Sequence, residues 1–211
     1  GGLAFSRSAL LPEAINRTLK DFPQVVVRTV EGPIHSLLSG MHAGEIDFLI
    51  CAQPNPALLE GVSLTPIVRD PMKFYVSREH PLASRRALSA EEVQRYPFIL
   101  PPQGSVTRDL LDSVFKETTG ELPLGAVETS SYPVIRYLLL HSEQISFRSI
   151  MEFNADSPHG LIVPLDLDFP LPERSICLLQ RSDVRQTAAV QEFFDTVRNI
   201  PVIGSVTQAC S

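Results

Sequence analysis

Apolar residues in the first fifty positions alternate between the spacing of helices and the spacing of strands. They recur every three or four residues over 10–19 and again over 34–41, which predicts two helices. Residues 25–30 are rich in β-branched side chains, which predicts a strand. Residues 46–51 form a continuous apolar run with one acid, Asp47, which is typical of a buried parallel strand. Residues 1–5 resemble the end of a further strand. The pattern therefore predicts βαβ units with a parallel sheet and right-handed crossovers.

The same alternation restarts in the second part of the chain. A short helix is predicted over 88–96, where Ser89 and Glu92 have the spacing of a capping box. The other predicted helices cover 108–118, 132–140 and 186–199, and the predicted strands cover 62–68, 72–76, 98–100, 125–128, 145–147, 161–163 and 175–179.

The two sets of elements are joined by two passages, one near Pro71 and one near residues 172–175. We therefore expect an α/β fold of two Rossmann-like lobes joined by two crossing strands. Lobe I would comprise 1–71 and 176–203, lobe II would comprise 72–175, and 204–211 would form a C-terminal tail. Two crossing strands form a hinge, and a hinge favours closure around a ligand.

Composition excludes several functions for this chain by itself. Its 211 residues carry a net charge of −6, and the longest basic cluster is Arg85-Arg86. We therefore expect that this chain by itself does not bind DNA or RNA. No apolar run approaches the roughly 20 residues of a membrane span. The three cysteines, Cys51, Cys177 and Cys210, are odd in number and widely spaced, which favours reduced thiols in a cytosolic protein.

Motifs for catalysis are absent from the sequence. It has no Gly-rich phosphate loop, nucleophile elbow or zinc-protease motif, and no Cys/His spacing that fits zinc. Asp166 and Asp168 have no third ligand nearby in sequence, which favours solvated acids over a cation site. We therefore expect no catalytic residue, no metal and no cofactor, and we expect that the chain is not an enzyme.

Polar loops follow several predicted strands, and in open α/β sheets ligands bind at this edge. For any single loop, ordinary helix capping by Ser and Thr explains the residues equally well. Four loops of this kind at one sheet edge favour a shared ligand cleft; they are residues 5–8, 52–54, 103–107 and 129–131.

Together these features resemble the effector-binding domain of LysR-type transcriptional regulators. The resemblance extends to about residue 200, and four stretches carry it: 1–12, 31–32 with 44–47, 70–82, and 97–108. It implies a periplasmic-binding-protein-like fold of type 2, a cytoplasmic location and a small organic effector. It also implies that DNA is bound only through an N-terminal helix-turn-helix that this chain lacks.

The resemblance further implies a side-by-side homodimer, with a tetramer of the full-length protein as an alternative. The surfaces expected to meet are residues 25–30 with the helix from Leu10, and the helix from Arg108 of the other copy. The outward face of an edge strand at 25–30 would carry apolar groups that need covering.

Departures from the family pattern bear on the effector. Phe5 and Ile34 stand where the family often has Ser or Thr, and Ala52 stands where members that bind aromatic acids have Arg. Residues 142–149 replace the usual Gly-rich motif of the second lobe. These changes predict a first lobe that is more apolar than is usual in the family. They also mean that the effector of another family member cannot be assigned to this chain.

The expected effector site lies between the lobes. The residues that would line it are Phe5, Ser6, Ile34 and Gln53 from lobe I, and Gln103, Ser105, Thr107, Thr129 and Phe147 from lobe II. The start of a helix at Ser105 and Thr107 favours an anion or a carbonyl oxygen. A monocarboxylate is favoured over a dianion, because a dianion would need a bidentate Arg and only Arg7 and Arg148 are near.

Two other classes of protein remain in view. An extracytoplasmic solute-binding protein of the same fold would have the same cleft, with a signal peptide upstream in place of a basic helix-turn-helix. An enzyme similar to prephenate dehydratase or porphobilinogen deaminase would have a related fold, but its catalytic constellation is not recognisable in the sequence.

Overall fold

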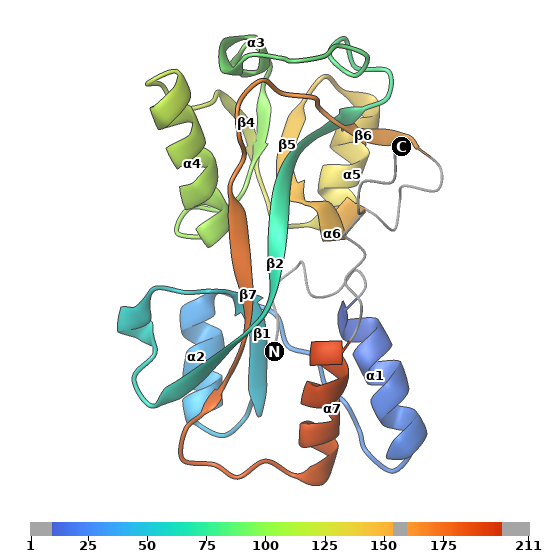
Figure 1. Ribbon diagram of the computed structural model, residues 1–211, viewed down its shortest axis with the longest axis vertical. Helices are drawn as coiled ribbons and strands as arrows, with labels where there is room; N and C mark the ends of the chain where they lie inside the picture. The colour runs from blue at the N-terminus through green and yellow to red at the C-terminus, as the bar shows by residue number, and fades with distance from the viewer. Residues whose placement is uncertain (1–9, 154–159, 200–211) are drawn as a thin grey trace, which may run out of the picture. The chain divides into compact units, whose positions relative to one another are not determined.

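The computed structural model describes residues 10–153 and 160–199, which divide into two compact units (Figure 1). Unit 1 comprises the chain up to Arg69 and from Ser175 onward, and unit 2 comprises Asp70–Arg174. The sequence prediction placed these two passages after residues 71 and 175. Strands β2 (Val62–Ser77) and β7 (Glu173–Arg181) each continue from one unit into the other.

Unit 1 is built on the antiparallel pair of β1 and β7, with Cys51 opposite Cys177. The ring of Phe48, at the start of β1, makes a tilted contact with Phe193 and an edge-on contact with Phe194 of α7, at centroid distances of 4.9 and 5.0 Å. A separate cluster from α2 packs against β1 and includes Leu37, Met41 and Leu49. The elements confined to this unit are α1 (Leu10–Asp21), α2 (Ile34–His42), β1 (Phe48–Ala52), the 3-10 helix η2 (Pro56–Leu58) and α7 (Ala188–Asn199).

The strand predicted over residues 25–30 is wrong: the chain has no regular secondary structure there. Val26 is 80% exposed and Val30 is 44% exposed. β-branched residues favour a strand only where a neighbouring strand supplies hydrogen bonds and packing. No strand of the described residues pairs with this segment.

Unit 2 contains a mixed sheet with the order β2-β5-β3-β4, and β6 pairs with the other edge of β2. β3 is parallel to β4 and β5, whereas β2 is antiparallel to β5 and β6. The two strands predicted over 62–68 and 72–76 form the single strand β2. The remaining elements are α3 (Ala90–Gln94), β3 (Phe98–Leu100), α4 (Val106–Thr118), β4 (Gly125–Glu128), α5 (Tyr132–His141), β5 (Ile145–Ser149), α6 (Ile150–Phe153) and β6 (Ile162–Pro164).

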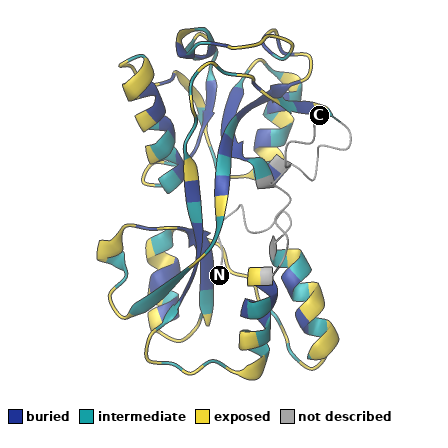
Figure 2. Ribbon diagram, viewed as in Figure 1, coloured by how far each residue is buried: buried dark blue, intermediate teal, exposed yellow. Residues whose placement is uncertain are grey.

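The two faces of this sheet pack against different helices, as Figures 1 and 2 show. Phe74 of β2 belongs to a core cluster that includes Phe115 of α4, whereas the next residue, Tyr75, belongs to a cluster that includes Leu139 of α5. Residues of a strand alternate between the two faces of the sheet. Because helices cover both faces, the ends of the strands are the part of the sheet left open. The predicted capping box at Ser89 is confirmed, with both of its hydrogen bonds present.

Candidate functional site

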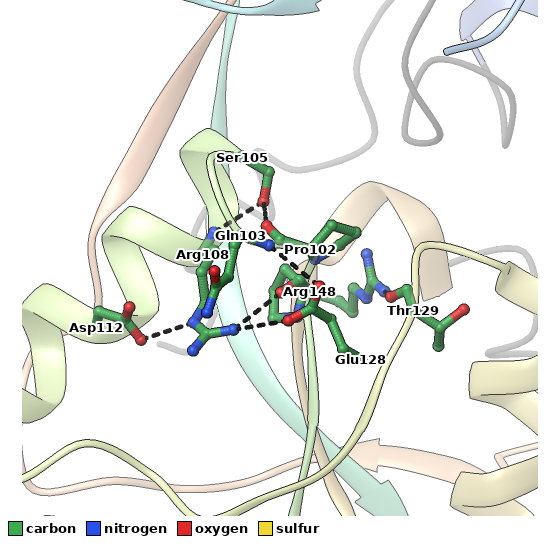
Figure 3. A network of polar contacts seen from close by, with 9 residues as sticks. Pro102, Gln103, Ser105, Arg108, Asp112, Glu128, Thr129 and Arg148 are labelled. Carbon is green, nitrogen blue, oxygen red and sulfur yellow. Dashed lines mark hydrogen bonds and ion pairs between the residues drawn. The ribbon is translucent and has the colours of Figure 1, made fainter. Parts of the chain in front are cut away.

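The start of α4 follows the carboxyl end of β3 and carries two of the predicted site residues, Ser105 (Figure 3) and Thr107. Ser105 caps the helix: its Oγ accepts from the backbone N–H of Arg108 at 3.2 Å and donates to the Pro102 carbonyl at 2.7 Å. Thr107, two residues on, is only 8% exposed. A helix start presents backbone N–H groups without intrahelical partners, so this turn offers donors to an anion or a carbonyl oxygen.

Arg108 ties α4 to the end of β4 and is itself neutralised. Its guanidinium donates to Asp112 at 2.9 Å and to Glu128 at 3.4 Å (Figure 3). Glu128 also accepts from the backbone N–H of Gln103 at 3.4 Å. The loops after β3 and β4 are thereby held together, and the charge of Arg108 is balanced by carboxylates of the protein.

A buried ionic network lies behind this turn, inside unit 2. Arg174 donates from Nε to Asp70 and from Nη1 to the Thr107 hydroxyl, both at 2.7 Å. The Ser149 hydroxyl donates to the other oxygen of Asp70. All four residues are at most 8% exposed. A buried charge is tolerated only when it is paired and hydrogen-bonded, and this arrangement meets that condition for Asp70.

Glu152 of α6 connects this network to Arg148 of β5. Its carboxylate lies 3.6 Å from Arg174 and 3.8 Å from Arg148. Arg148 also donates from Nη2 to the Thr129 carbonyl at 3.2 Å (Figure 3). Burial lowers the pKa of the Arg148 guanidinium, an effect that Glu152 opposes and Arg174 reinforces. The two acids, Asp70 and Glu152, balance the two arginines, so the network is formally neutral.

Burial raises the pKa of Tyr75 above its ordinary value, and the nearby carboxylates of Glu152 and Asp70 raise it further. The phenol therefore stays neutral across the physiological range. Its neutrality leaves the charge balance of the network to the two acids and the two arginines.

Some of the predicted site residues belong to unit 1. Phe5 and Ser6, together with Arg7, fall outside the described residues. Ile34 begins α2 and packs, half-buried, against its core cluster. Gln53 follows β1 directly, is exposed, and donates its backbone N–H to Ser175 at 2.8 Å.

Four of the predicted residues of unit 2 lie at the carboxyl ends of β3 and β4, namely Gln103, Ser105, Thr107 and Thr129. Phe147 does not join them, which corrects the expectation that its ring faces a ligand. It is opposite Phe74 in the β2–β5 register and has no exposed surface, and the two ring centroids lie 5.2 Å apart. Strand alternation directs Phe147 into the core and its neighbours Ser146 and Arg148 to the other face.

Sequence reasoning missed Asp70, Ser149, Glu152 and Arg174. Asp70 and Arg174 are 104 positions apart, and no local spacing indicates that they meet. The available signal was weak: Asp70 and Arg174 are charged residues just before the predicted apolar strands 72–76 and 175–179, where a buried ion needs a partner.

The described ranges contain no helix that is long and apolar enough to cross a membrane. Within those same ranges, no three His, Cys, Asp or Glu side chains gather in a way that could hold a metal ion.

The family model and the curated relatives that match this chain point to the same family. The family model described as the LysR substrate binding domain matches residues 3–200. The HTH-type transcriptional regulator GalR of Pseudomonas putida is 30% identical over 200 residues, which cover 95% of this chain and 50% of GalR. The uncharacterised HTH-type regulator YdcI of Escherichia coli is 24% identical, over 94% of this chain and 64% of YdcI. The chain thus spans about half the length of GalR and under two thirds of YdcI.

Two solved structures share the fold over almost the whole chain. The effector-binding domain of QuiR in complex with shikimate has a TM-score of 0.77 and 19% identity, over 93% of this chain and 92% of that one. The Synechocystis CcmR regulatory domain in complex with 2-PG has a TM-score of 0.82 and 17% identity, over 97% and 96%. The expected fold class, α/β and periplasmic-binding-protein-like of type 2, is confirmed.

Proposed function

The chain belongs to the LysR substrate-binding domain family, and we propose that it senses a small organic molecule with a carboxylate at the carboxyl ends of β3 and β4 in unit 2. The single observation that carries this proposal is the first turn of α4. There the donors of a helix start lie beside Thr107, which is held by a buried arginine. Nearby Arg108 is neutralised by Asp112 and Glu128, which favours a monoanion over a dianion.

The ligands of the structural neighbours support the same chemical class. QuiR and CcmR were solved with shikimate and 2-PG, which are small organic molecules. The expectation that the effector of this chain lies between two lobes, with Ile34 and Gln53 among its contacts, stays a prediction. The ligand class is supported by the contacts of Thr107 and Arg108 within unit 2.

The full-length protein would be a cytoplasmic transcriptional regulator, and effector binding to this domain would change its affinity for DNA. The curated relatives GalR and YdcI are regulators of the helix-turn-helix type, which supports this proposal over an extracytoplasmic solute-binding protein. DNA would be bound by a separate helix-turn-helix. The domain itself would carry no catalysis, because its family is one of effector-binding domains.

We also propose that the domain forms a homodimer through residues 25–30 and α1 of one copy and α4 of the other. The exposed side chains of Val26 and Val30 support this assignment, because neighbouring apolar groups on a surface usually mark an interface. Light scattering of the wild-type chain should give a dimer, and Val26→Asp should shift it to monomer. A wild-type chain that is monomeric at high concentration contradicts the proposal.

A thermal-shift screen of small carboxylates, with shikimate among them, tests the proposed effector class. A ligand at 100 times its dissociation constant stabilises the fold by about 2.7 kcal/mol. Gln103→Trp places a bulky side chain at the exposed loop before α4 and should abolish the shift. Glu117→Trp, on the exposed last turn of the same helix, should keep it. A shift that survives Gln103→Trp would mean that the ligand binds elsewhere.

A further inference from the structure

The hydroxyls of Ser105 and Thr107 differ in the hydrogen-bonding role that remains to them. Ser105 donates its hydrogen to the Pro102 carbonyl and accepts from the Arg108 backbone, so its donor is used within the protein. The Thr107 hydroxyl accepts from Arg174 at 2.7 Å. A guanidinium has donors and no acceptor, so the Thr107 hydrogen points away from Arg174.

The direction of the Arg174–Thr107 bond cannot reverse. A guanidinium offers no acceptor, and the rigid planar fork of Arg174 is fixed by a second bond to Asp70, also at 2.7 Å. A hydroxyl that accepts from a cation is polarised and becomes a stronger donor, most of all in a buried setting. Arg174 and Thr107 are both only 8% exposed.

We propose that Arg174 is a positioning residue that fixes the Thr107 hydroxyl as a donor and so selects an oxygen acceptor of the effector. The inference rests on the proposed function, in which the effector binds at the start of α4. The backbone N–H groups of this turn are also donors. The turn therefore presents several donors, the Thr107 hydroxyl among them, and this favours a carboxylate oxygen over an ammonium or amino group. Ser105 acts there as the helix cap.

A double-mutant cycle on the unfolding equilibrium tests whether Arg174 orients Thr107. Thr107→Val keeps the side-chain shape and removes the hydroxyl, and Arg174→Lys keeps the charge beside Asp70 but lacks the fork that reaches both partners. We expect Thr107→Val to change the folding equilibrium constant about tenfold or more in the wild type, since charged hydrogen bonds stabilise by about 1.5–3 kcal/mol. In the Arg174→Lys background the change should fall to about twofold.

Thr118→Val is the matched control on the same helix, because the Thr118 hydroxyl bonds only to the Val114 carbonyl in its own helix. Its effect should be the same in both backgrounds. Equal effects of Thr107→Val in both backgrounds would overturn the inference. If Arg174→Lys does not fold, the stabilities of Thr107→Ser and Thr107→Val are compared instead. Thr107→Ser should be the more stable of the two because it keeps the hydroxyl, and equal stability would overturn the role of the hydroxyl.

Ligand selection is tested with carboxylates, shikimate included, each paired with the primary amine of the same skeleton. Calorimetry should show binding of a carboxylate and at least tenfold weaker binding of its amine. Thr107→Val should weaken the carboxylate about tenfold, and Thr107→Ser should restore most of it. An amine that binds as tightly as its carboxylate overturns the selection. A panel in which no carboxylate binds overturns the proposed function instead, while the cycle still decides whether Arg174 orients Thr107.

Discussion

Strand β7 runs through two contrasting environments. At its beginning Arg174 belongs to unit 2 and makes directional contacts to Asp70, Thr107 and Glu152. In unit 1 the same strand continues as residues 176–179, which are all apolar and at most 2% exposed, and it pairs with β1. Both stretches are buried, but one is held by hydrogen bonds and charges and the other by apolar contact.

The two environments should respond differently to substitution. Apolar burial stabilises roughly in proportion to area and has little directional preference, so changes there alter stability more than geometry. In the ionic network, removal of one member leaves its partners buried without compensation. Stability should therefore depend on both regions, whereas the geometry of the α4 turn should depend on the network alone.

The largest effect should come from removing the charge of Asp70. Asp70→Asn removes the carboxylate that lies 2.7 Å from Arg174, and breaking a buried pair in this way costs about 3–5 kcal/mol. Urea denaturation measures the loss. Asp166→Asn, which breaks an exposed ion pair with Arg86, should cost no more than about 0.5 kcal/mol.

Combining Asp70→Asn with Arg174→Met separates pairing from packing. Because the double variant contains no uncompensated arginine at this point, it should recover part of the stability lost by Asp70→Asn. Strict additivity of the two single losses would show that the pair is not coupled and would remove the contrast between the two regions.

Elements with a clear period or a local signal were predictable from the sequence. Strands 98–100 and 125–128 were predicted at their observed bounds, and the cap at Ser89 follows from a local motif. The predicted strand over 25–30 failed because strand formation depends on a partner that is distant in sequence. Phe147 failed for a related reason: a strand residue's face is set by its register against β2.

The candidate site was predictable only where it is local. Ser105 and Thr107 were found because a Ser at the start of a predicted helix is a recognisable cap. The contacts behind Thr107 come from Arg174, which is 67 positions away. Such a pair is created by the fold, and no pattern along the chain distinguishes Arg174 from a solvated arginine.

A cavity in the apolar stretch should be the next largest effect. Leu179 has no exposed surface and packs in the cluster of α2 and β1, so Leu179→Ala should cost about 2–5 kcal/mol in urea denaturation. Leu124→Ala, at a position 67% exposed, should change stability by less than about 0.5 kcal/mol. The coupling between Thr107 and Arg174 should be unchanged in Leu179→Ala, and a changed coupling would contradict the separation of the two regions.

The low polarity of the β1–β7 pair should appear at alkaline pH. Burial, together with the facing Cys177, raises the pKa of Cys51 from 9.0 to about 12. The unfolded chain releases this proton first, so the stability is complete below about pH 9 and is lost as the pH rises toward 12. The slope for one proton is about 1.4 kcal/mol per pH unit. In urea denaturation at a series of pH values, Cys51→Ala should lose less unfolding free energy per pH unit above pH 9 than the wild type. Parallel plots of unfolding free energy against pH for the two proteins would contradict the prediction.

The smallest effect concerns His80, a buried polar group of unit 2 that is held by neutral hydrogen bonds. Its Nδ1 accepts from the Leu82 backbone at 3.1 Å, so Nε2 carries the hydrogen and donates to the Glu143 carbonyl at 3.2 Å. Burial lowers the pKa of His80, an effect that the Glu143 carbonyl partly opposes. The folded state binds a proton more weakly than the unfolded chain, so unfolding free energy should fall as pH drops below about 6.5. For one proton the slope cannot exceed about 1.4 kcal/mol per pH unit.

His80→Asn retains an acceptor for the Leu82 backbone and does not titrate, so it should remove this acid slope. His141→Asn changes an exposed ring and should leave the slope in place. An acid slope that persists unchanged in His80→Asn would contradict its assignment to His80.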